Sequence, residues 1–77
     1  MHMPIASAVV EIKEGTSAAV LGRLAHIRRI SVYGVKENQI VTVIEGQTVN
    51  DVNVTVKEVS MLEEVIGVFP VFVGEYD

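Results

Sequence analysis

The chain has 77 residues, a formal net charge of −4 and no cysteine. Disulfides, thiolate metal sites, iron–sulfur clusters and thiol nucleophiles are therefore excluded, and the acidic balance opposes binding to nucleic-acid phosphate. The length suits a single domain over residues 1–77, and a hydrophobic fraction of 49% is enough for one core.

Residues 1–3 lack the basic and apolar regions of a secretory signal, so we expect them to be an expression remnant or a disordered end. The first predicted element is a strand over residues 4–14, with Ala6, Ala8, Val10 and Ile12 in one phase and Ser7, Val9 and Glu11 in the other. Gly15 ends this strand, and Thr16 or Ser17 is expected to cap a helix by accepting a backbone N–H bond.

Apolar residues recur along that helix at spacings of three and four; they are Val20, Leu21, Leu24 and Ile27. His26, Arg28 and Arg29 are expected at its C-terminal end, where cations are favourable. A second strand follows over residues 30–36. Glu37 and Asn38 then predict a hairpin turn, because Asn tolerates the left-handed conformation.

The third predicted strand, residues 39–45, is apolar in both phases. Thr48 and Asp51 resemble a capping box that starts a helix over residues 49–61. The alternation of Val52, Val54 and Val56 also fits a strand, but a helical stripe of Val49, Val52, Val56 and Val59 favours the helix. The last strand is predicted over residues 65–76, with Val68, Phe72 and Tyr76 in one phase and Phe69, Val71 and Val73 in the other.

The order strand, helix, strand, strand, helix, strand predicts an α+β ferredoxin-like split βαβ sandwich. Right-handed crossovers place both helices on one face of a four-stranded antiparallel sheet. The second face should then be polar. Instead it would carry Val9, Val41, Val43, Phe69, Val71 and Val73, which Tyr33 and Val35 are expected to join.

An uncovered apolar face of this extent usually marks an interface. Either two copies pack sheet to sheet, or the face binds a segment of another protein. Glu11 and Glu45 continue the uncovered phase, so the face suits a segment that is apolar along its length and basic at one end.

No constellation for chemistry is evident. His2 and His26 have no partner at metal-ligand spacing, the serines have no evident base, and the glycines form no phosphate loop. We therefore expect no enzyme activity, no metal and no cofactor. No apolar stretch reaches the ~20 residues that cross a bilayer, so stable membrane insertion is not expected.

Three segments together resemble the NapD family, the assembly chaperones of periplasmic nitrate reductase: IASAVVEIKE, QIVTVIEG and EEVIGVFPVFVGEY. The resemblance covers nearly the whole chain in element order and strand character. It implies a cytoplasmic, ferredoxin-like protein that binds the twin-arginine signal peptide of the catalytic subunit and delays export until the molybdenum cofactor is loaded. The peptide would bind as a helix across the exposed sheet.

By that resemblance and by strand phase, the signal-peptide-binding residues would be Ser7, Val9, Glu11, Tyr33, Val41, Val43, Glu45, Phe69 and Val71. Pro70 departs from a regular strand and puts the phase around it in question. The alternative function is a small-ligand-sensing regulatory domain of the same fold that dimerises through its sheet. A weak homodimer is compatible with the chaperone as well.

Overall fold

The computed structural model describes residues 3–76; the expectations for Met1 and His2 lie outside the described residues. Its elements are β1 (Met3–Ile12), α1 (Ser17–Leu24), β2 (Ile30–Lys36), β3 (Gln39–Glu45), α2 (Val49–Ser60) and β4 (Val65–Tyr76). Met3 belongs to β1, where it lies opposite Tyr76 of β4.

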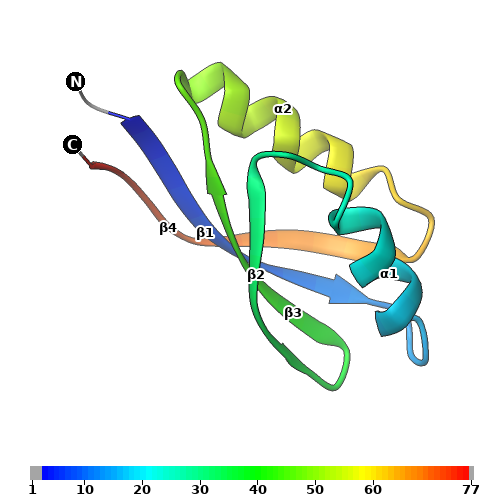
Figure 1. The fold of residues 1–77 in the computed structure, drawn as a ribbon. Coiled ribbons are helices and arrows are strands. Elements are labelled where there is room, and N and C mark those ends of the chain that lie inside the picture. The colour runs from blue at the N-terminus through cyan, green and yellow to red at the C-terminus, as the bar shows by residue number, and fades with distance from the viewer. Residues whose placement is uncertain (1–2, 77) are drawn as a thin grey trace.

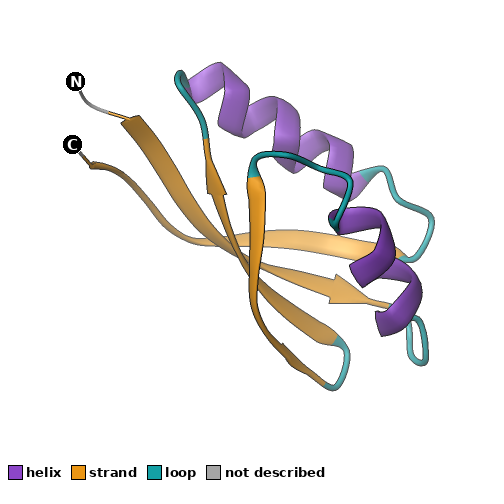
Figure 2. Cartoon of the chain, viewed as in Figure 1, coloured by secondary structure: helices purple, strands orange, loops and turns teal. Residues whose placement is uncertain are grey.

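The four strands form one antiparallel sheet in the order β2-β3-β1-β4, with both helices on the same side of it (Figure 1). Figure 2 shows the two layers, strands below and helices above, joined by short loops. The predicted ferredoxin-like βαββαβ fold is confirmed. The central strands are β1 and β3, and the edges are β2 and β4.

The core lies between the sheet and the helices. Every second residue of β1 is buried, and from β3 the residues Ile40, Thr42 and Ile44 are fully buried. Thr42 is polar, but its hydroxyl donates a 2.9 Å hydrogen bond to the Ala8 carbonyl, so the burial leaves no unpaired donor. The period of two therefore assigns one face of both central strands to the core.

Helix α1 buries Val20 and Leu24, and Leu21 and Ile27 pack against the same cluster, as their spacing predicts. The helix ends at Leu24, so His26, Arg28 and Arg29, which were expected at its C-terminal end, lie beyond it. The predicted cap is wrong in detail: the Thr16 hydroxyl donates to the Lys13 carbonyl at 2.6 Å and accepts no bond from the helix.

Helix α2 begins with the predicted capping box. The Thr48 hydroxyl accepts from the Asp51 N–H at 3.1 Å, and the Asp51 carboxylate accepts from the Thr48 N–H at 3.3 Å. Val52 and Val59 are buried while Val54 is exposed, which confirms the helical interpretation of this valine-rich segment.

The hairpin between β2 and β3 contains the one non-glycine residue with positive φ among residues 3–76. It is Glu37, with φ 54°, and not Asn38, to which the sequence had assigned the left-handed conformation.

Extra residues in two strands change the predicted phases. Tyr33 has no partner in the β2–β3 register, and Ile66 and Val71 have none in the β1–β4 register. Each is a β-bulge, which shifts every following side chain to the other face. Beyond the bulges Val35 pairs with Ile40 and Val73 with Ala6, on the helix-covered face, whereas Phe72 pairs with Ser7 on the uncovered one. The predicted faces of Val35, Phe72 and Val73 are therefore wrong.

Pro70 is compatible with the sheet because β4 is an edge strand. Its partner Ala8 belongs to the residues of β1 that turn their N–H and C=O groups toward β3, as the bond from the Ile12 N–H to the Asn38 carbonyl at 2.8 Å shows. The ring nitrogen of Pro70 therefore points away from β1, where a missing N–H costs no ladder bond.

Candidate functional site

The face of the sheet that the helices leave uncovered, called the open face below, is defined by the strand register. Side chains opposite one another on neighbouring antiparallel strands point to the same side. Its members are Ile5, Ser7, Val9 and Glu11 of β1, Gln39, Val41, Val43 and Glu45 of β3, Ser31, Gly34 and Lys36 of β2, and Gly67, Phe69, Phe72 and Gly74 of β4.

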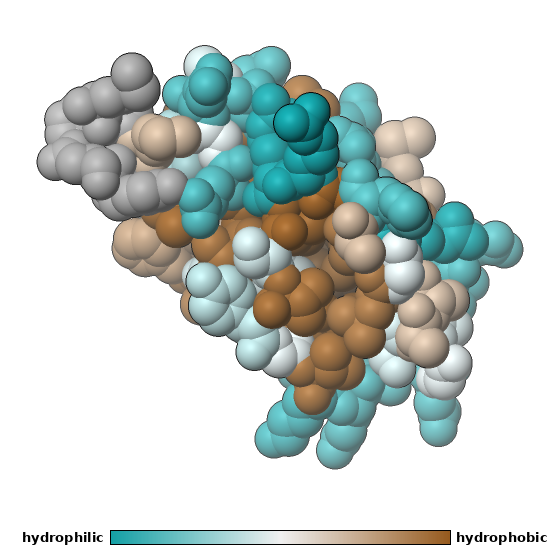
Figure 3. Space-filling view, viewed as in Figure 1, coloured by the Kyte–Doolittle hydropathy of each residue, from teal (hydrophilic) through white to brown (hydrophobic). Residues whose placement is uncertain are grey.

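The centre of the open face is apolar. Val9 lies between Val41 and Phe69, and in the next row Ser7 lies between Val43 and Phe72. The two phenylalanines are 52% and 58% exposed, which is far from the burial that large apolar side chains usually find. Figure 3, in which α1 lies in front of the strands, shows apolar surface below the hydrophilic side chains of α2 as well.

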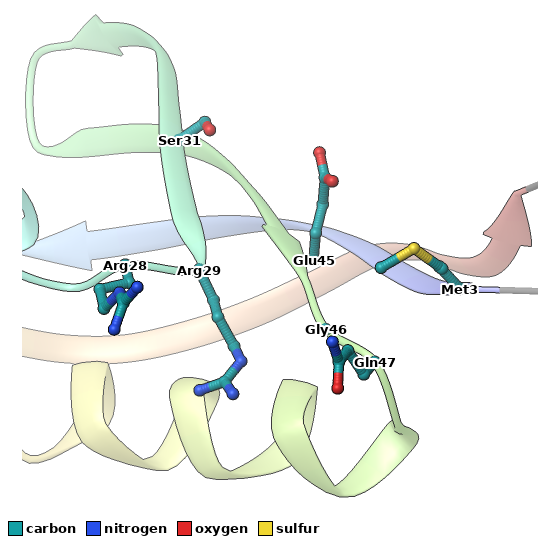
Figure 4. A pocket seen from close by; sticks show the side chains of 7 residues that line it. All are labelled: Met3, Arg28, Arg29, Ser31, Glu45, Gly46 and Gln47. Atoms are coloured by element: carbon teal, nitrogen blue, oxygen red, sulfur yellow. The ribbon is translucent and has the colours of Figure 1, made fainter.

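Carboxylates stand at both ends of this centre. Glu45 lies opposite Ile5, and Glu11 lies opposite Gln39, six residues further along β1 and therefore about 20 Å away. Figure 4 shows the Glu45 side chain directed away from α2, while the Arg28 and Arg29 side chains are directed toward it. The carboxylate of Glu45 thus belongs to the open face and the arginines do not.

The register brings seven of the nine predicted binding residues onto the open face: Ser7, Val9, Glu11, Val41, Val43, Glu45 and Phe69. The other two, Tyr33 and Val71, are each the extra residue of a bulge and are 72% and 70% exposed. Phe72 was missed. Pro70 was its only signal, because a proline inside a strand indicates an edge or a bulge.

Residues 3–74 match the family model described as NapD protein. The chain belongs to the NapD family.

The fold of this family member agrees with a solved one. The solution structure of the Escherichia coli Tat proofreading chaperone protein NapD superposes with a TM-score of 0.85 at 19% sequence identity, covering 97% of this chain and 81% of that chain. No match was found among curated proteins.

A second feature of this NapD-family chain is a pocket of about 490 Å³ between the loop before β2 and the loop after β3 (Figure 4). It is lined by Met3, Arg28, Arg29, Ser31, Glu45, Gly46 and Gln47. Arg29 forms two interactions there. Its guanidinium lies 3.6 Å from the Asp51 carboxylate, and its backbone carbonyl accepts a 2.9 Å hydrogen bond from the Glu45 N–H. These bonds fix the two loops against the start of α2.

No metal-binding group of three or more His, Asp or Glu side chains occurs within residues 3–76. Neither helix in that range is long and apolar enough to cross a membrane. The open face itself offers apolar side chains on central strands and two carboxylates, a combination suited to holding a ligand.

Proposed function

We propose that this chain is a cytoplasmic assembly chaperone. It binds the twin-arginine signal peptide of the catalytic subunit of a periplasmic nitrate reductase and delays export until the molybdenum cofactor is loaded. Membership of the NapD family and the likeness to a protein titled a Tat proofreading chaperone support this role. Such a role needs a peptide-holding surface and no catalytic group.

The observation that carries the proposal is the apolar centre of the open face. A sheet covered on one side normally presents polar residues on the other, whereas Val9, Val41 and Val43 occupy the middle of this one. The side chains are β-branched and attached to central strands, so they lose little freedom when a partner covers them.

A twin-arginine signal peptide fits this surface chemically. It is basic at its start and apolar afterwards, and the open face is apolar in the centre with Glu11 and Glu45 at its ends. Four strands span about 14 Å across, enough for one helix with a diameter of about 10–12 Å. The apolar part would lie on the centre as a helix, with the arginines at one of the two glutamates.

The sequences of the central strands oppose one other use of the fold, and a second is left to experiment. An RNA-binding sheet needs stacking aromatic and basic residues on its central strands, and the sequences of β1 and β3 contain neither. A ligand-sensing regulatory domain would act as a tight sheet-to-sheet dimer, and the peptide titration below tests this alternative directly.

The test is a calorimetric titration with the synthetic signal peptide, using Val41→Glu as the disruptive variant. Val41 is 42% exposed at the centre of the face, so an added carboxylate costs little in the free protein but would be buried unpaired beneath the peptide. We expect binding to weaken by roughly a hundredfold or more.

Val54→Glu is the matched control, because Val54 is 45% exposed on α2, on the opposite side of the molecule. It should leave the affinity within about twofold of the wild type. Equal affinities for both variants would disprove the site. A tight dimer that ignores the peptide and is stabilised by an amino acid would support the sensor instead.

A further inference from the structure

The two phenylalanines of the open face each lie over a glycine of the same strand. A Cβ placed on Gly74 would lie 2.5 Å from Cζ of Phe72, and a Cβ placed on Gly67 would lie 3.0 Å from Cζ of Phe69. Neither glycine has a positive φ; the described glycine that has one is Gly15. The backbone would accept alanine at both positions, so it is the rings that need glycine there.

The two rings lean apart. Phe69 reaches toward Gly67, near the start of β4, and Phe72 reaches toward Gly74, near its end. Both rings remain about half exposed. A ring on a bare edge-strand glycine gains dispersion contacts and shields the backbone, which holds it in place without a partner.

Between the two rings β4 continues through Pro70 and Val71, and the partners of the rings on β1 are Val9 and Ser7. Ser7 has the smallest side chain in the centre of the open face, so it leaves the most room beside Phe72. Val71, the extra residue of the bulge, adds the length of chain that separates the two rings.

We propose that Gly67 and Gly74 hold the two rings apart by seating them, and that the space between the rings, called the notch below, receives one large apolar side chain of the docked helical segment. The inference rests on the proposed function, which it extends from a surface to a specificity-determining position. Rings that are already held in place need not be ordered when the peptide binds. The affinity of the notch for the peptide therefore depends on the two glycines as well as on the two phenylalanines.

The decisive variant is Gly74→Ala. The alanine methyl group cannot coexist with the Phe72 ring where it lies, and because the ring is the far end of a flexible side chain, the ring moves and the strand does not. We expect binding of the synthetic signal peptide to weaken by about five- to tenfold. Gly67→Ala needs a smaller displacement, and its effect should be less than about threefold.

Gly22→Ala is the control. Gly22 lies in α1, away from the open face, and a Cβ there meets no atom within 4 Å. The affinity of this variant should equal that of the wild type. If Gly22→Ala weakens binding as much as Gly74→Ala, the loss is a general effect of replacing glycine with alanine and the inference is overturned.

A readout independent of the peptide is the ring-current shift of the glycine Hα protons in the NMR spectrum. In the free wild type, both Gly67 and Gly74 should show upfield Hα signals, and Phe72→Leu should abolish the shift at Gly74 alone. In the complex, one apolar peptide side chain should show nuclear Overhauser contacts to the rings of both Phe69 and Phe72.

The double variant separates a positioning role from a structural one. With leucine at position 72 there is no ring to displace, so Gly74→Ala on the Phe72→Leu background should not weaken binding further. Additive losses would overturn the inference, as would a Gly74→Ala variant that binds like the wild type. If the wild type binds no peptide while the upfield Hα signals are present, the proposed function is disproved, although the rings do lie against the two glycines.

Discussion

At the scale of single residues, the two glutamates of the open face are not equivalent. Lys36 lies in the same row as Glu11, separated from it by Gln39, whereas Glu45 lines a pocket together with Arg28 and Arg29. Cations near each glutamate offset part of the attraction that its carboxylate can offer to the arginines of a peptide. Substituting each glutamate in turn therefore shows at which end of the open face the basic part of a bound segment lies.

The corresponding prediction compares Glu45→Gln with Glu11→Gln. Exposed ion pairs contribute about 0.2–1 kcal/mol, so substituting the glutamate that meets the arginines should weaken peptide binding by about two- to fivefold, and substituting the other should weaken it less. Calorimetry measures both affinities, and glutamine preserves the shape of each side chain. The larger loss identifies the end of the open face at which the arginines lie, whereas no loss with either variant would contradict an ion pair at either end.

The residue scale is also where prediction from sequence fails. A strict period of two assigns every strand residue to a face, and this holds throughout β1 and β3. It fails after Tyr33 and after Val71, because one inserted residue reverses all later assignments. Pro70 indicated an irregularity, but a proline does not say which neighbour is the extra residue.

At the scale of elements, the two helices start in different ways. The Thr48 hydroxyl accepts a hydrogen bond from the backbone of α2 as part of a capping box, while the hydroxyl of Thr16 at the start of α1 points back to the Lys13 carbonyl. A threonine at both N-caps hides this difference in the sequence, because the geometry of the preceding turn decides which bond forms.

The difference predicts unequal costs for the same substitution. Thr48→Ala removes an acceptor for the Asp51 N–H and should lower the free energy of unfolding by about 1 kcal/mol. Thr16→Ala removes only a donor to a solvent-accessible carbonyl and should cost less than about 0.5 kcal/mol. Urea denaturation followed by circular dichroism gives both values. Equal losses would show that Thr16 caps α1 in solution after all.

At the scale of the whole molecule, the fold follows from element order. Two strand–helix–strand halves joined at the Glu37–Asn38 hairpin leave few topologies once crossovers are right-handed, and the sheet order β2-β3-β1-β4 is the expected one. The open face also follows, because both helices are used on the other side. Its detailed shape does not, since the bulges and the seated rings arise from contacts between strands far apart in the sequence.

Overall charge yields the last prediction. The chain carries a net charge of −4, so the field of the whole molecule attracts a segment with two arginines, in addition to any single ion pair. Raising the ionic strength from about 0.05 M to about 0.5 M shortens the Debye length from about 14 Å to about 4 Å and should weaken binding several-fold.

A peptide in which both arginines are replaced by glutamine should bind less tightly but with little salt dependence, because apolar contacts are not screened. Calorimetry of both peptides at the two salt concentrations provides the comparison. Parallel salt dependences would mean that the arginines do not meet the acidic surface, and that the apolar centre binds the segment without regard to its basic end.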